Sequence, residues 1–128
     1  LIKLKKMIKK LNKKKIRTSL FIDPTINNVK LSKLIKSNSV EFHTGKISNK
    51  IKQNKPYGSE LKKIKKCSVY AKKLGLEVHA GHGMDYKTAN ILSKINEIEE
   101  FNIGHFLIGE SILYGLKETV LNFKKILG

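Results

Sequence analysis

Residues 39–45 read SVEFHTG and residues 76–83 read LEVHAGHG, and these two stretches are the strongest indication of the fold. Each begins with alternating apolar side chains, which is typical of a strand, and ends in a loop that carries histidine and glycine. Two related stretches flank them, residues 16–23 (IRTSLFID), which Pro24 ends, and residues 100–105 (EFNIGH). We therefore expect strands over residues 16–23, 39–43, 76–80 and 100–103, the first of them buried.

Apolar residues at helical spacing occupy the segments between these strands. We expect helices over residues 27–36, from the N-cap Ser59 to the stop signal Gly75, and after Asp85, which can cap a helix. A final helix is expected to bury five regularly spaced residues, Ile112, Leu116, Val120, Phe123 and Leu127. The polar stretch 46–58 is predicted to be a long loop, either a lid or an ordinary connection.

The order of these elements predicts an α/β fold, because alternating strands and helices build a parallel sheet with helical crossovers. The four strand–helix units are preceded by a helix, whose apolar face consists of Leu1, Leu4, Met7, Ile8 and Leu11. Four units fit either a small open sheet or half of an eight-stranded barrel, which normally needs about 250 residues.

The start of the chain favours the barrel. The chain has 128 residues and begins inside a helical pattern without an initiator methionine. We therefore expect residues 1–128 to form a single partial domain, the C-terminal half of a TIM-type (β/α)8 barrel whose N-terminal half is absent.

Positive charge dominates the sequence, which has a formal net charge of +17. Residues 1–75 hold 22 of the 27 basic residues, so a basic module that binds nucleic acid is one alternative function. However, the basic residues are 26 lysines and one arginine, whereas nucleic-acid readers favour arginine. A genome rich in A and T explains the lysine surplus at least as well, and we do not expect a nucleic-acid partner.

Other features of composition narrow the function classes further. The lone Cys67 excludes an internal disulfide framework. It belongs to a helical apolar stripe that we expect in the core, made of Leu61, Ile64, Cys67 or Ser68, Ala71 and Leu74. No apolar run reaches the roughly 18 residues of a membrane span, and no signal-peptide pattern opens the chain. We expect a cytoplasmic protein without a membrane partner.

Three of the four histidines lie where the strands are expected to end, which is where parallel α/β folds place their functional sites. They are His43, His82 and His105, each beside a glycine or one residue from it. Glycine lets backbone N–H groups approach a ligand, and histidine exchanges protons near neutral pH. The glycines on both sides of His82 favour a functional role for it over a packing role.

For two pairs of residues near the strand ends, the sequence allows two interpretations. Glu41 and His43 share one face of a strand and form either a structural ion pair or a functional pair. Gly104 and His105 form either a simple turn or, because a helix follows them, part of an anion site.

The remaining candidates are predicted to be structural. His79 lies inside a strand and is expected to pack, and Asp23 is expected to close a turn before Pro24. The histidines lack a metal-ligand spacing such as HExxH, so we expect no metal ion.

In order and spacing, the motifs SLFIDP, VEFHTG, GLEVHAGHG and EFNIGH resemble the pyridoxine 5'-phosphate synthase family. The resemblance covers essentially the whole chain and corresponds to the C-terminal half of that enzyme. It implies a (β/α)8 barrel that condenses 1-deoxy-D-xylulose 5-phosphate with 3-amino-2-oxopropyl phosphate. The products are pyridoxine 5'-phosphate, phosphate and water, made without a metal or organic cofactor. The resemblance also implies that the complete protein forms homo-oligomers.

The same resemblance implies roles for particular residues. Glu41 falls on the family's glutamate that stabilises the transition state, and His82 falls on its proton donor. Gly83, Gly104 and His105 fall on positions that bind 3-amino-2-oxopropyl phosphate. Because the family's other acid–base groups come from its first half, we expect this chain alone to be inactive.

Overall fold

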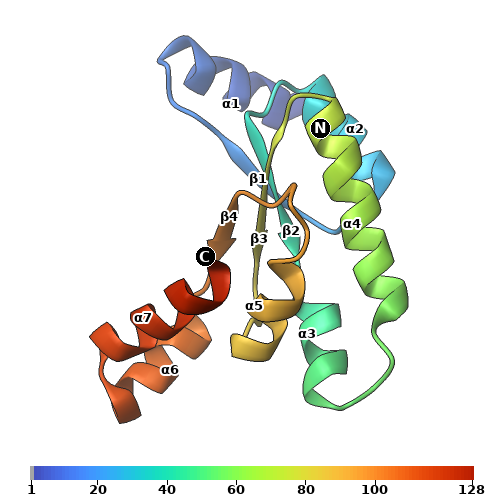
Figure 1. Ribbon diagram of the computed structural model, residues 1–128. Coiled ribbons are helices and arrows are strands. Elements are labelled where there is room, and N and C mark those ends of the chain that lie inside the picture. The colour runs from blue at the N-terminus through green and yellow to red at the C-terminus, as the bar shows by residue number, and fades with distance from the viewer. Residues whose placement is uncertain (1) are drawn as a thin grey trace.

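A parallel four-stranded sheet lies at the centre of this computed structural model, which describes residues 2–128 (Figure 1). Its strands are β1 (Ser19–Ile22), β2 (Ser39–His43), β3 (Glu77–Gly81) and β4 (Glu100–Asn102). Their order in the sheet is their order in the chain, and every neighbouring pair is parallel. A barrel winds in one direction in this way, whereas a doubly wound sheet reverses its strand order. The expected α/β architecture, with the winding of half a TIM-type barrel, is therefore confirmed.

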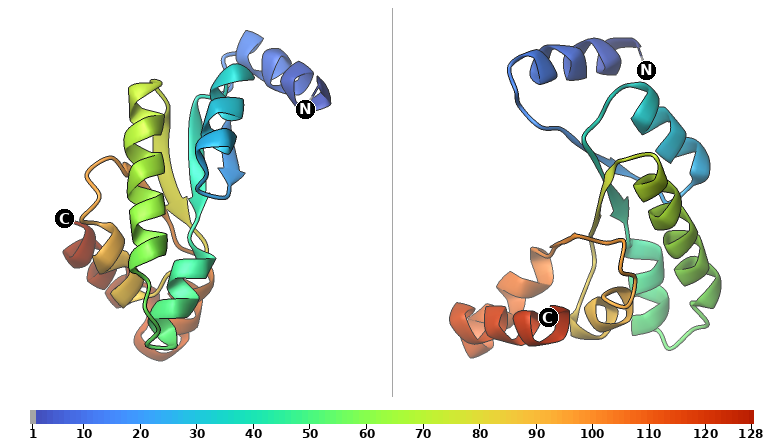
Figure 2. Two further views of the ribbon diagram at one scale, coloured as in Figure 1. Left: turned by 90° about the vertical axis from the view of Figure 1, so that its right-hand side faces the viewer. Right: turned by 45° about the horizontal axis from the view of Figure 1, so that its top comes forward.

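Helices alternate with these strands along residues 2–128. They are α1 (Ile2–Lys13), α2 (Ile26–Leu34), α3 (Gly45–Lys52), α4 (Gly58–Lys73), α5 (Tyr86–Leu92), α6 (His105–Tyr114) and α7 (Leu116–Leu127). The helices α2 and α4 run along one face of the sheet, α1 lies toward the amino ends of the strands, and α6 and α7 lie toward their carboxyl ends (Figures 1 and 2). Within residues 2–128, no helix is long and apolar enough to cross a membrane.

Within residues 2–128, helices cover one face of the sheet and leave the other open. Val40, Phe42, Val78 and Ala80 are fully buried and form the core with apolar side chains of α2, α3, α4 and α5. The residues that alternate with them point to the opposite, open face. A closed barrel turns such a face inward, so polar side chains there are available to a ligand site.

The prediction of a long loop over residues 46–58 is wrong, because α3 occupies the first half of this stretch. Ile47, Ser48 and Ile51 are buried and form the face of α3 that packs on the core. Ile47 and Ile51 are four residues apart, which is helical spacing, but they are the only apolar side chains of this helix. In addition, Thr44 at the N-cap position makes no capping hydrogen bond with its side chain, so no capping motif marks the helix start.

The prediction of a single final helix from its apolar spacing is also wrong. The helix is divided into α6 and α7 at Gly115, which has φ 83° and ψ 146°, a conformation that glycine adopts readily. Because the helix is interrupted there, the apolar residues before and after Gly115 do not form one continuous face. Of the residues expected to be buried, only Phe123 is buried, Leu127 is half-buried, and Ile112, Leu116 and Val120 are 81%, 56% and 37% exposed.

The boundaries of other elements move by a few residues. The strand predicted over residues 16–23 is shortened to β1 and is not buried, because β1 lies at one edge of the sheet and Phe21 is 55% exposed. The third strand begins and ends one residue later than predicted, and the fourth ends one residue earlier. The helix predicted over residues 27–36 is α2, which starts one residue earlier and ends two residues earlier.

Several local signals are confirmed. The Asp85 side chain accepts a hydrogen bond from the Thr88 N–H and caps α5, and Gly75, at φ 70°, follows the end of α4. The helix α4 starts at Gly58 with Tyr57, not Ser59, as its N-cap. Its predicted stripe is buried at Ile64, Cys67, Ser68 and Ala71. On the predicted face of α1, Ile8 is buried, Leu11 is half-buried, Leu4 and Met7 are exposed, and Leu1 lies outside the described residues.

Candidate functional site

A cavity of about 570 Å³ opens at the carboxyl ends of the strands. All five residues to which the family resemblance gives a role line it, namely Glu41, His82, Gly83, Gly104 and His105. They come from β2, from the loop after β3 and from the junction of β4 with α6. Parallel pairing places these three chain segments side by side at one edge of the sheet.

The Glu41 carboxylate is held on the open face of the sheet. The backbone of Glu41 pairs with that of His79 on β3, and its Oε2 accepts a hydrogen bond of 3.0 Å from the Asn102 Nδ2 on β4. Its side chain therefore reaches over β3, and it passes above Gly81. A Cβ at Gly81 would overlap Oε1 of Glu41 and lie 2.9 Å from its Cδ. Glycine at position 81 is thus what allows the carboxylate to lie there.

His82 lies in a backbone conformation that few residues with a side chain adopt. Its φ is 80°, and Gly83 follows with φ 75°. The Thr44 hydroxyl, which is buried, is 2.8 Å from the carbonyl oxygen of Gly81 and 2.7 Å from that of His82. Lys52 donates a hydrogen bond of 3.0 Å from Nζ to the carbonyl oxygen of Gly83. Contacts from the β2–α3 region thus hold successive carbonyl groups of the loop.

Aromatic rings gather beside His82. The imidazole rings of His43 and His82 are stacked, with centroids 4.6 Å apart and an angle of 26° between their planes. Phe21 on β1 meets His43 edge to face, with centroids 5.2 Å apart. The side chains of Glu41 and His43 therefore share one face, as predicted, but their partners differ: Glu41 binds Asn102, and His43 packs on His82.

The junction of β4 with α6 opens into the same cavity. Gly104 is the N-cap of α6 and His105 is its first residue, and no side chain caps this helix start. The first N–H groups of a helix lack partners within the helix and carry partial positive charge, so they attract anions. Because Gly104, His105 and Phe106 all line the cavity, this end of α6 faces the space beside Glu41 and His82. The anion-site interpretation of Gly104 and His105 stays a prediction, which this position of the helix start allows.

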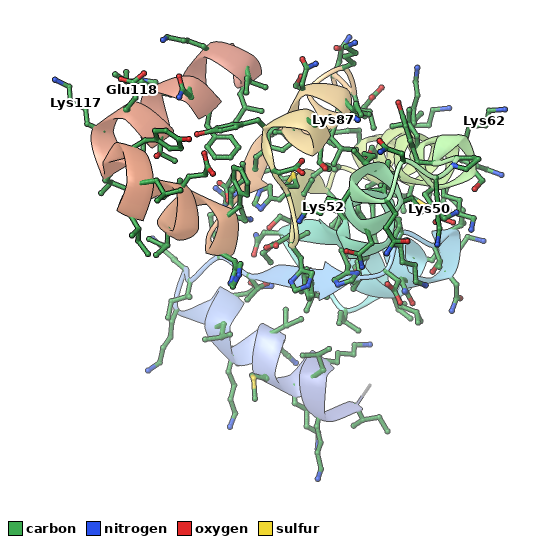
Figure 3. The ribbon with its side chains drawn as sticks, turned by 90° about the horizontal axis from the view of Figure 1, so that it is seen from below. Lys50, Lys52, Lys62, Lys87, Lys117 and Glu118 are labelled. Carbon is green, nitrogen blue, oxygen red and sulfur yellow. The ribbon has the colours of Figure 1, made fainter. Side chains whose placement is uncertain are left out.

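Lysines lie around this end of the molecule. Lys50 and Lys52 on α3 and Lys87 on α5 lie between Lys62 on one side and Lys117 with Glu118 on the other (Figure 3). Lys50 forms an ion pair with Glu60 at 3.4 Å, and Lys63 forms another at 3.3 Å. Partial burial opposes ionisation of Glu60, but the hydrogen bonds and charges of the two lysines outweigh it, so the pKa of Glu60 is below its ordinary value.

The residues predicted to be structural lie outside the cavity lining. His79 has Glu77 and Glu100 within 3.7 Å and 3.5 Å of its ring nitrogens. The Asp23 carbonyl accepts a hydrogen bond from the Thr25 N–H, as expected for a turn. Cys67 is buried in the core, where desolvation raises the pKa of its thiol. Within residues 2–128, no group of three or more histidine, cysteine, aspartate or glutamate side chains could hold a metal ion.

Several residues of the site were not identified from the sequence. Asn102 lies at the end of a predicted strand, and strand alternation together with the register could have placed it opposite Gly81. Phe21, Thr44 and Gly45 are different, because their contacts with the His82 loop join segments that are distant in the chain. No local pattern reports such contacts.

Comparisons with known proteins show which family the chain belongs to. The sequence profile of the family described as "Pyridoxal phosphate biosynthesis protein PdxJ" matches residues 1–128. The pyridoxine 5'-phosphate synthase of Pelagibacter ubique is 62% identical over 124 residues, which are 97% of this chain and 52% of that protein. The proteins of the same name from a Sulfurihydrogenibium species and Zymomonas mobilis are 41% and 38% identical, over 97% of this chain and 50% and 48% of their own lengths.

The chain spans about half the length of the curated relatives that it matches. The family match, in contrast, extends along all of its 128 residues. The fold, the position of the cavity and this match lead to one conclusion: the chain belongs to the PdxJ family of pyridoxal phosphate biosynthesis proteins.

Proposed function

We propose that this chain is the C-terminal half of the (β/α)8 barrel of a pyridoxine 5'-phosphate synthase. In the complete protein it would condense 1-deoxy-D-xylulose 5-phosphate with 3-amino-2-oxopropyl phosphate and release phosphate and water. The relatives named pyridoxine 5'-phosphate synthase support the activity, and their length, about twice that of this chain, supports the missing half. Residues 1–128 would then be one partial domain of a cytoplasmic homo-oligomer.

One observation carries this proposal. The acidic Glu41, the histidine His82 and the uncapped start of α6 surround a single cavity of about 570 Å³. A condensation that loses water needs groups that give and take protons, and a phosphorylated substrate needs N–H donors that are already in place. The cavity brings both kinds of group to one end of the sheet.

The roles follow from the chemistry of each group. His82 would donate a proton to a leaving oxygen, because an imidazole changes its protonation near neutral pH. Glu41, oriented by Asn102, would stabilise positive charge that develops in the transition state. Gly83, Gly104 and His105 would bind the phosphate group of 3-amino-2-oxopropyl phosphate, since this part of the cavity includes the start of α6.

The test is the steady-state assay of the complete protein that contains this chain, with phosphate release and pyridoxine 5'-phosphate formation measured together. Removing the proton donor in His82→Ala is expected to lower kcat by about 100-fold or more. Lys62→Ala is the matched surface control and should leave kcat unchanged, because Lys62 lies on the outside of α4 (Figure 3). A complete protein that forms no pyridoxine 5'-phosphate would refute the proposed function.

The nucleic-acid alternative predicts a different pattern. If the lysines of residues 1–75 were the functional groups, replacing several of them would weaken nucleic-acid binding and reduce its salt dependence. His82→Ala would then have no effect. We expect the reverse pattern, with activity lost at His82 and kept in the lysine variants.

A further inference from the structure

The stacked pair of His43 and His82 extends the role of β2 in the site. We propose that His43 is a positioning residue, whose ring holds the His82 imidazole in the orientation that the proposed reaction needs. This inference rests on the proposed function for its effect on catalysis. Its structural content, that one ring orients the other, can be tested separately.

Geometry provides the first argument. The two imidazoles lie 4.6 Å apart at 26°, which is a stacked arrangement, and Phe21 approaches His43 at 74° and His82 at 57°. His43 thus lies between the edge contact with Phe21 on β1 and the exposed ring of His82. Its own side chain is 28% exposed, whereas His82 is exposed and lines the cavity. The more buried ring is the support, and the exposed ring is the one supported.

Gly45 provides the second argument, because it leaves room for both rings. A Cβ at position 45 would lie 2.8 Å from Cε1 of His43 and 3.1 Å from Cδ2 of His82. Both imidazoles therefore lie against the first residue of α3, which has no side chain to displace them. The stack is accommodated by the backbone of α3 and is not merely a contact between two surface side chains.

The hydrogen bonding of His43 provides the third argument. Its Nδ1 is buried and has no hydrogen-bond partner within the described residues, and the nearest carboxylate oxygen, Oδ1 of Asp23, is 3.8 Å away. No hydrogen bond at Nδ1 therefore fixes the orientation of this ring, so its packing against Phe21 and against the backbone of Gly45 does. If packing is the function of His43, a flat ring without nitrogen atoms should replace it.

Such support matters because no side-chain hydrogen bond among residues 2–128 holds the His82 imidazole. Thr44 holds the backbone of this loop through the carbonyl oxygens of Gly81 and His82, but those contacts do not orient the imidazole. A proton donor that lies out of place by even 1 Å loses much of its effect. The stack with His43 orients the ring where the backbone contacts do not.

The first experiment observes the ring itself by NMR in the complete protein that contains this chain. In His43→Phe, the His82 side chain should keep one preferred χ1 angle, whereas in His43→Ala it should sample several. The matched control is His79→Phe, at a histidine on the open face of β3 that does not stack on His82. A χ1 preference of His82 that is unchanged in His43→Ala would overturn the proposal, and its retention in His43→Phe excludes general unfolding as the cause.

The second experiment measures kcat and KM in the complete protein. We expect His43→Ala to lower kcat by about 10- to 100-fold with little change in KM, and His43→Phe to restore most of the loss. Equal loss in both variants would overturn the proposal, because it would require the nitrogen atoms of His43. If the unaltered complete protein makes no pyridoxine 5'-phosphate, the proposed function fails, and the NMR result still decides whether His43 orients His82.

Discussion

Gly81 shows how a single missing side chain shapes the candidate site. It lies at the end of β3, buried beneath the carboxylate of Glu41. Asn102 donates a hydrogen bond to that carboxylate. The missing side chain at Gly81 on β3 therefore leaves the space that the Glu41 carboxylate on β2 occupies.

Gly81→Ala is expected to displace the Glu41 carboxylate, because the new Cβ would overlap Oε1. Since the displaced group is the end of a half-buried, flexible side chain, the loss of stability should be about 1 kcal/mol or less. The loss of kcat should be at least about tenfold, because the hydrogen bond from Asn102 would be broken. Thermal unfolding and the steady-state assay of the complete protein separate the two effects.

Gly58→Ala is the matched control for this substitution. A Cβ at Gly58 meets no atom within 4 Å, and Gly58 is the first residue of α4, so alanine should leave kcat unchanged. If Gly81→Ala also kept its kcat, the position of the Glu41 carboxylate would not limit the reaction.

At the scale of elements, α3 links the site to the rest of the fold. It buries Ile47 and Ile51 against the core, and its start lies under the His43 and His82 rings. Its end supplies Lys52, which binds the Gly83 carbonyl, and Lys50, which pairs with Glu60 on α4. A change at the junction of α3 and α4 should therefore be measurable as a change in stability.

The Glu60 ion pairs predict a loss of stability in acid. Because the pKa of Glu60 is lowered in the folded state, its contribution is fully present above the ordinary glutamate value of 4.5 and is lost as pH falls through the lowered value. Glu60→Gln should cost about 0.5–1 kcal/mol at neutral pH, because Lys63 is exposed and Lys50 is only half-buried. Urea unfolding at pH 7 and at about pH 3 should show this difference only at pH 7.

Glu97→Gln is the control for the acid prediction, because Glu97 makes no ion pair within residues 2–128. This substitution should change the free energy of unfolding by a similar, small amount at both pH values. A Glu60→Gln protein with the same stability as the unaltered chain at pH 7 would mean that these ion pairs contribute nothing.

At the scale of the whole molecule, the open face of the sheet is the decisive feature. The strands β1 and β4 are both edges of the sheet, and Phe21 on the open face is 55% exposed. The helix α6 has no buried residue, and Ile112 and Leu113 are 81% and 74% exposed. Unpaired edges and exposed apolar side chains favour pairing with further structure or aggregation.

The 128-residue chain alone is therefore expected to show no measurable synthase turnover. Its half of the cavity carries Glu41 and His82 but not the acid–base groups that the family resemblance places in the first half. The assay that detects pyridoxine 5'-phosphate in the complete protein gives the comparison. Steady turnover by the chain alone, abolished by His82→Ala, would contradict this expectation.

The intact mass of the polypeptide in its source organism tests the proposed domain organisation. We expect a mass near twice 14.6 kDa, because the curated relatives are about twice as long as this chain. A native mass of 14.6 kDa would show that the half barrel is made as a separate chain. It would then need a partner for activity.

Much of the candidate site could be predicted because its residues belong to short motifs at strand ends. Glu41, His82 and Gly83 each lie in such a motif, and all of them line the cavity. The prediction failed where local pattern and tertiary packing disagree. The helix α3 has only two apolar side chains, Ile47 and Ile51, and packs through them. The apolar spacing of residues 112–127 continues through a break at Gly115.

The alternation of strands and helices and the residues at the strand ends can be read from the amino-acid sequence, because periodicity and the positions of glycine are local properties of the chain. Which of these residues meet depends on the folded structure. Asn102 orients Glu41 across β3, and His43 stacks on His82 above Gly45, through contacts between segments far apart in the chain. Such contacts depend on strand register and helix placement, which packing of the whole core sets.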